Sequence, residues 1–159
     1  MNELQRLIMF LKIQYHNFGI LHRHLDGDPC WFENHEELDE WKCCVAKQLD
    51  ELCEEAQALG YPEPGLKDAL LTFGSEEVTP ELRGLQETFR IAQSMMRSIS
   101  GMMQAAEKEV PASVVSKLQE MEYGWNKLAD YKLARTLGER GGGMSREKRP
   151  EPAAEYDDD

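Results

Sequence analysis

A single long helix, predicted from Asp28 to Gly60, constrains the fold of this chain more than any other feature. Asp28-Pro29 is a typical helix start, and Gly60 is a typical helix stop. Between them, apolar residues recur at helical spacing and mark a face for the core: Leu38, Trp41, Val45, Leu52, Ala56 and Leu59. A long helix with one apolar face needs other helices to cover it, which predicts an all-α bundle.

A second stripe of this helix carries one imidazole and three carboxylates. At about 100° per residue, Asp39, Asp50 and Glu54 lie roughly 40°, 60° and 100° around the helix from His35. Imidazole and carboxylate groups are ligands for a hard or borderline divalent metal such as iron. Small residues on the same stripe would let another helix come close: Cys43, Ala46 and Cys53. The stripe therefore predicts a metal site, with an ordinary solvated acidic face as the alternative.

The length of the helix determines how such a site is built. At roughly 1.5 Å rise per residue, Asp50 lies about 22 Å along the axis from His35. One metal ion cannot reach both ends, so His35 and Asp39 form one half-site, and Asp50 and Glu54 form another. The two half-sites can meet only if the same helix of a second copy runs antiparallel to the first, as it does across a two-fold axis. The sequence predicts a dimer with two equivalent sites, each shared between chains.

The overall composition is that of a globular protein with an excess of acid. The chain has 159 residues, 30 of them Asp or Glu and 18 Lys or Arg, and a formal net charge of −12. This balance argues against DNA as a partner. No apolar run approaches the ~20 residues of a membrane span. The N-terminus lacks the pattern of a signal peptide, and the cysteines form no disulfide or zinc pattern, so we expect a cytoplasmic protein.

The other helices are predicted from the same kind of pattern. A first helix covers residues 2–25, with a seam that includes Tyr15, His22 and Leu25. A connection of about 20 residues follows Gly60 and holds at most a short helix over 66–73, which suits a bundle with one crossover. A third helix is expected from Thr79, with Leu82 on its seam, and a fourth over 112–137. Residues 1–138 are then one bundle, and the charged, Gly- and Pro-rich 139–159 are expected to be a disordered tail.

This layout, together with the polar stripe, resembles the Dps family of mini-ferritins, which are ferritin-like four-helix bundles. The family pattern is a His near the end of the first helix, then His-x-x-x-Asp and Asp-x-x-x-Glu on the second. It matches His22, His35 with Asp39, and Asp50 with Glu54. The resemblance spans roughly residues 2–137 in layout and is sharp only between His22 and Gly60.

The resemblance implies a ferroxidase that stores and detoxifies iron under oxidative stress. These five residues would hold one or two non-haem irons at a site shared across the dimer two-fold, and a dodecameric shell would hold the ferric mineral. Hydrogen peroxide would be preferred over dioxygen as oxidant. His22, His35 and Asp39 would come from one chain, and Asp50 and Glu54 from its partner.

This sequence also departs from the family pattern. The interval from His22 to His35 is one residue longer than the usual interval between the corresponding histidines of the family. His24 is therefore an alternative to His22 as the ligand from the first helix. Arg23 stands where the family usually has Trp, and Trp31 is the nearest aromatic substitute. The lysine-rich N-terminal arm of DNA-binding members is absent. A second function from another class stays open: a non-catalytic helical bundle that acts as an interaction or adaptor protein.

Overall fold

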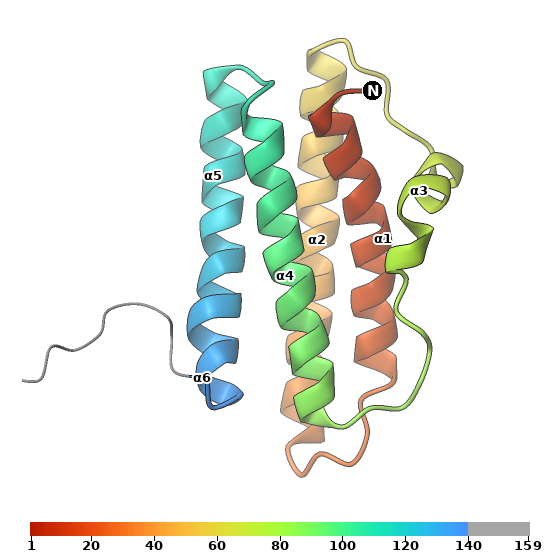
Figure 1. Ribbon diagram of the computed structural model, residues 1–159, viewed down its shortest axis with the longest axis vertical. Coiled ribbons are helices and arrows are strands. Elements are labelled where there is room, and N and C mark those ends of the chain that lie inside the picture. Colours follow the sequence, from red (N-terminus) through yellow and green to blue (C-terminus); the bar gives the residue numbers. More distant parts are fainter. Residues whose placement is uncertain (140–159) are drawn as a thin grey trace, which may run out of the picture.

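The computed structural model describes residues 1–139 and is all-helical in that part of the chain. Four long helices form the bundle: α1 (Glu3–Arg23), α2 (Trp31–Ala58), α4 (Leu85–Glu107) and α5 (Ala112–Asn126). Adjacent helices α1 and α2 run antiparallel, as do α4 and α5 (Figure 1). Across the described residues, no helix is long and apolar enough to cross a membrane. The predicted fold class is confirmed.

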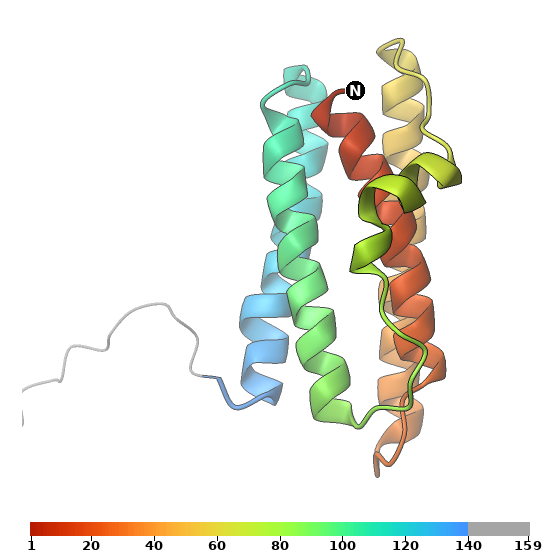
Figure 2. The ribbon, with the colours of Figure 1, turned by 45° about the vertical axis from the view of Figure 1, so that its right-hand side comes forward.

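A long crossover links α2 to α4. The chain leaves the end of α2 at Gly60, whose φ of +80° favours glycine. It then forms the short helix α3 (Leu66–Phe73), followed by the 3₁₀ turn Gly74–Glu76, and packs against α1. Figure 2 shows this segment on the outside of the α1/α2 pair before the chain descends to the start of α4. The crossover makes α4 parallel to α2, the arrangement of a bundle with one crossover.

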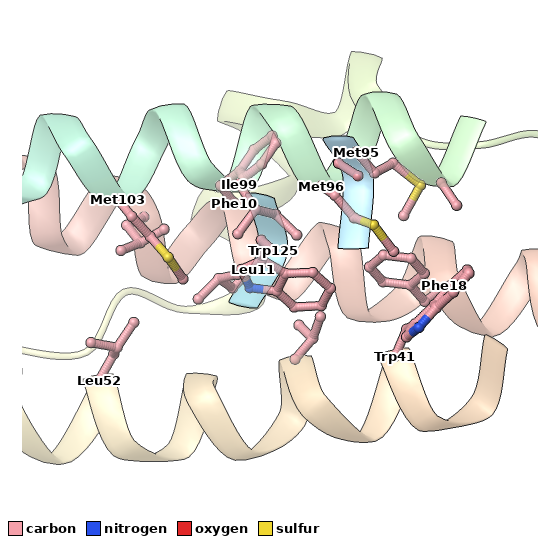
Figure 3. Packing of buried hydrophobic residues seen from close by; sticks show 14 of the residues in the cluster. Phe10, Leu11, Phe18, Trp41, Leu52, Met95, Met96, Ile99, Met103 and Trp125 are labelled. Atoms are coloured by element: carbon pink, nitrogen blue, oxygen red, sulfur yellow. The ribbon is translucent and has the colours of Figure 1, made fainter. Parts of the chain in front are cut away.

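The core lies between the four helices and is built around aromatic contacts (Figure 3). The fully buried ring of Phe18 stacks on Trp125, with centroids 5.9 Å apart, and meets the edge of Trp41 at 6.3 Å. The Trp125 indole donates its N–H to Gln48 Oε1 at 2.8 Å, so its one polar atom is satisfied. Methionines fill the remaining space at one face of α4: Met95, Met96 and Met103.

The second helix begins later than the sequence predicts, at Trp31 rather than Asp28. Asp28 instead organises the turn before the helix, where its carboxylate accepts the backbone N–H of Cys30 at 3.1 Å and the side-chain amide of Asn34. Trp31 anchors the same turn by donating its indole N–H to the Leu25 carbonyl at 2.8 Å. The first helix likewise ends at Arg23 rather than Leu25, because this turn has its own hydrogen bonds.

The third long helix also begins later, at Leu85 rather than Thr79. Residues 82–84 pair with the turn after α1: Arg83 N–H donates to the His24 carbonyl at 3.0 Å, and its carbonyl accepts from Asp26 N–H at 2.9 Å. Helical backbone cannot make this bridge. Leu82, predicted to lie on the helix seam, is consequently 69% exposed.

Two further expectations are corrected. Tyr15, placed on the seam of the first helix, is 42% exposed, because it lines a cavity shared with Leu66 and Leu70 of α3 and does not lie in the core. The last helix is not uniformly α: after α5 the chain follows a π-helical segment, Lys127–Leu133, and ends in the short α6 (Ala134–Thr136). The predicted tail lies, from residue 140 onward, outside the described residues.

Candidate functional site

The end of α1 and the start of α2 are joined through two histidines. His22 Nδ1 lies 2.9 Å from the His35 backbone carbonyl oxygen, and His35 Nδ1 lies 2.9 Å from the His22 carbonyl oxygen. A carbonyl oxygen can only accept, so both Nδ1 atoms carry the proton. In a neutral ring with this tautomer, Nε2 keeps its lone pair, which is the form of imidazole that binds a metal.

Three aromatic rings stack in this region. The imidazoles of His22 and His35 are parallel to within 23°, with centroids 3.8 Å apart. The Trp31 indole also stacks on the His35 ring, with centroids 4.3 Å apart and an angle of 18° between the ring planes. Because Trp31 is also fixed through its hydrogen bond to Leu25, the stack restricts the rotation of the His35 ring.

Asp39 lies one turn after His35 and is the carboxylate of the predicted half-site. Its Oδ1 is 3.8 Å from His22 Nε2. The same oxygen is 3.0 Å from the Lys42 ammonium. The hydrogen bond from Lys42 holds the pKa of the Asp39 carboxyl below its usual range, against the opposing effect of desolvation. Asp39 is therefore ionised at neutral pH, and its Oδ1 lies close to both the Lys42 ammonium and the His22 imidazole.

Asp50 and Glu54 are not brought to this cluster within the chain. Both are exposed on the second half of α2, and Asp50 is about 17 Å further along the helix axis than Asp39 at 1.5 Å per residue. Within residues 1–139, no three His, Cys, Asp or Glu side chains are grouped closely enough to hold a metal ion.

His24, the alternative to His22, has a different environment. Its Nδ1 lies 2.9 Å from the Ile20 carbonyl oxygen of its own helix. Its neighbour Arg83 contacts the His24 backbone carbonyl and not the ring. Of the two histidines, only His22 has an ion-pair distance to Asp39 and a ring stacked on His35.

Lys42 was not predicted from the sequence as part of this site, and Trp31 was expected only as the nearest aromatic substitute for the family's Trp. Lys42 lies three positions after Asp39, a spacing that brings side chains together on a helix, so this pair was readable. The stacking of Trp31 on His35 depends on the turn before α2 and had no such signal. Conversely, Cys53, predicted to face a second copy, is buried against its own chain, whereas Cys43 is exposed and Ala46 half-buried.

The arrangement of helices, with its crossover helix α3, is a Dps-like, ferritin-like fold. Antigen TpF1 from Treponema pallidum has a TM-score of 0.78 and 18% sequence identity, over 85% of this chain and 88% of that one. Dps from Staphylococcus aureus has a TM-score of 0.65 and 18% identity, over 85% of this chain and 92% of that one. No family model matches the sequence, and no curated protein matches it significantly. At these identities the likeness establishes the fold.

Proposed function

We propose that this protein is a ferroxidase that oxidises Fe(II) and stores the ferric product in an oligomeric shell. The observation that carries the proposal is the histidine pair that joins the end of α1 to the start of α2. His22 and His35 direct their Nδ1–H groups to backbone carbonyls, which leaves Nε2 of each ring for a metal, next to the ionised Asp39. Such hydrogen bonds fix the orientation of metal-binding imidazoles and raise their basicity.

The site would be completed by a second copy of the chain. The register that sets Asp39 opposite the partner's Asp50 also sets His35 opposite the partner's Glu54, because both pairs are equidistant from the midpoint between residues 44 and 45. The exposed Cys43 would then face the partner's Ala46, and these small side chains allow two helices to approach closely. The exposure of Asp50 and Glu54 supports this arrangement.

The mixed ligand set suits the oxidation of iron. Two imidazoles bind Fe(II), and three carboxylates per completed site favour Fe(III) once an electron has left. With peroxide as oxidant, two Fe(II) ions each lose one electron, and hydrogen peroxide takes two electrons and two protons to give two waters. The site would hold one or two irons as substrate, with Asp39 or Glu54 as the bridging carboxylate if there are two.

A matched pair of variants tests this function. Ferrous iron is added anaerobically to the native assembly, peroxide follows, and ferric absorbance is recorded while native mass spectrometry gives the subunit number. We expect oxidation well above buffer, at least 10-fold slower in Asp39→Asn and unchanged in Glu40→Gln, which removes the same charge from the exposed neighbouring position. Oxidation no faster than buffer would favour the non-catalytic adaptor instead.

A further inference from the structure

A cavity of about 450 Å³ is lined by residues of α1, α2 and the crossover helix α3. Its lining carries three permanent cations, Lys12, Arg23 and Lys42, against one carboxylate, Glu77. This sign is opposite to that of the chain, which has a formal net charge of −12. The volume lies within the range of small-ligand sites. Carboxylates outside the lining pair with two of these cations, Glu63 with Lys12 and Asp39 with Lys42, which leaves Arg23 to supply the uncompensated charge.

Arg23 is the cation in this lining with no partner among residues 1–139. Lys12 is bound to Glu63 at 2.6 Å, and His16, also in the lining, lies 3.2 Å from Glu77. The Arg23 guanidinium instead lies over Gly19, where an added Cβ would be 3.1 Å from Nη1. Glycine at this position thus makes room for the guanidinium at the cavity wall, where its donors are available to an anion.

Lys42 connects the cavity to the proposed metal site. Its ammonium is 3.0 Å from Asp39 Oδ1, the oxygen that a metal at His22 would need, and its side chain also lines the cavity. A metal ion at this carboxylate would add positive charge beside the ammonium and repel it toward the cavity. The repelled ammonium would then approach Arg23 in the cavity, where like charges repel. An anion in the cavity would offset this repulsion.

We propose that this cavity binds a small oxyanion of the phosphate or sulfate class, and that Lys42 couples the anion to divalent-cation binding at Asp39. The anion is held by Arg23 and draws Lys42 away from the carboxylate. Because coupling is reciprocal, a bound metal ion raises the affinity for the anion by the same factor. This coupling rests on the proposed function, whereas anion binding by itself does not.

The anion half is tested by calorimetry on the native, metal-free assembly, with sulfate as titrant and chloride keeping the ionic strength constant. We expect saturable binding that weakens at least 5-fold in Arg23→Gln and by less in Gly19→Ala, whose added Cβ would shift the guanidinium slightly. Arg90→Gln is the matched control, since it removes an exposed arginine of α4 outside this cavity. Absence of saturable sulfate binding, or equal losses in all three variants, would overturn the proposal.

The coupling half is tested by Co²⁺ titration of the same assembly in sulfate and in chloride at equal ionic strength. We expect Co²⁺ to bind about 5-fold more tightly in sulfate, the lower end of common coupling strengths. Sulfate in solution also pairs with Co²⁺, but this lowers the free Co²⁺ concentration and makes binding look weaker. Ion pairing therefore cannot produce tighter binding in sulfate. In Lys42→Gln the difference between the salts should disappear. Co²⁺ binding that is equal in both salts would refute the coupling, whereas no Co²⁺ binding in any variant would refute the proposed function as well.

Discussion

His22 and His35 each donate their Nδ1–H to the backbone carbonyl of the other, over equal distances of 2.9 Å. This crossed pair joins the last turn of α1 to the first turns of α2, although the residues between them form an irregular turn. Both rings are therefore fixed by backbone atoms before any metal binds. If the pair binds metal as proposed, rings held in this way would lose less conformational entropy on binding than free side chains.

The shared site makes a prediction about mixed variants. Asp39→Ala and Asp50→Ala should each be inactive alone, because every site then lacks one carboxylate. When the two are co-expressed in equal amounts, about half of the dimers should be mixed if chains pair at random, and one of the two sites in each mixed dimer holds both residues intact. About a quarter of wild-type ferroxidase activity should return. No recovery, with mixed dimers verified by mass, would mean that the sites are not shared.

The stack of Trp31 on His35 predicts an effect of the indole on metal affinity. Trp31→Ala frees the His35 ring and should weaken Co²⁺ binding by about 10-fold, the lower end for residues that orient metal ligands. Trp31→Phe keeps a ring in the stack and should stay within about 3-fold of wild type. Phe32→Ala serves as the control, since Phe32 is the next residue and is 62% exposed. Equal affinities of the Ala and Phe variants would argue against this positioning role.

The cysteines should react with a thiol reagent in a fixed order. Burial, with the negative charge of Glu63 next in importance, raises the pKa of the Cys53 thiol to about 11. The thiolate is the reactive form, so at pH 8 nearly all of Cys53 is unreactive, and its labelling rate should rise with pH until about 11. Cys30 is exposed and should be labelled first, as mass spectrometry of digested protein would reveal. Labelling of Cys53 as fast as Cys30 would show that the helix opens.

Cys43 gives a separate test of the dimer. It is exposed in the single chain but faces the partner's Ala46 in the proposed register. Its labelling should therefore be several-fold slower in the native assembly than in dissociated subunits, whereas the rate at Cys53 should not change. Equal rates at Cys43 in both states would place the interface elsewhere.

The aromatic core predicts where the fold is most sensitive to substitution. Phe18 is fully buried between Trp125 and Trp41, so Phe18→Ala should lower the free energy of unfolding by about 3–5 kcal/mol. The exposed Phe32, changed to Ala, should cost less than about 0.5 kcal/mol. Chemical denaturation measures both, at one protein concentration, because subunit association also contributes to stability. Similar losses for the two variants would contradict the placement of the core.

Regular features of this protein could be predicted from the sequence because they depend on local periodicity. Apolar residues at helical spacing located the long helices, and the long link after Gly60 indicated the crossover. The same periodicity placed His35 and Asp39 on one face, and Asp50 and Glu54 further along it. It failed at Leu82 and Tyr15, whose exposure depends on neighbouring segments: Leu82 belongs to the stretch that bridges the turn after α1, and Tyr15 lines a cavity shared with α3.

The sequence by itself determined the bundle, its crossover and the spacing of the polar stripe, since a helix repeats the same geometry along its length. Only the tertiary structure decided that His22 rather than His24 meets Asp39, that Trp31 stacks on His35, and that Lys42 lines the same cavity as Arg23. These relationships depend on how α1 and α2 approach each other across an irregular turn. Side-chain contacts between helices are set by that approach, which no local pattern of residues encodes.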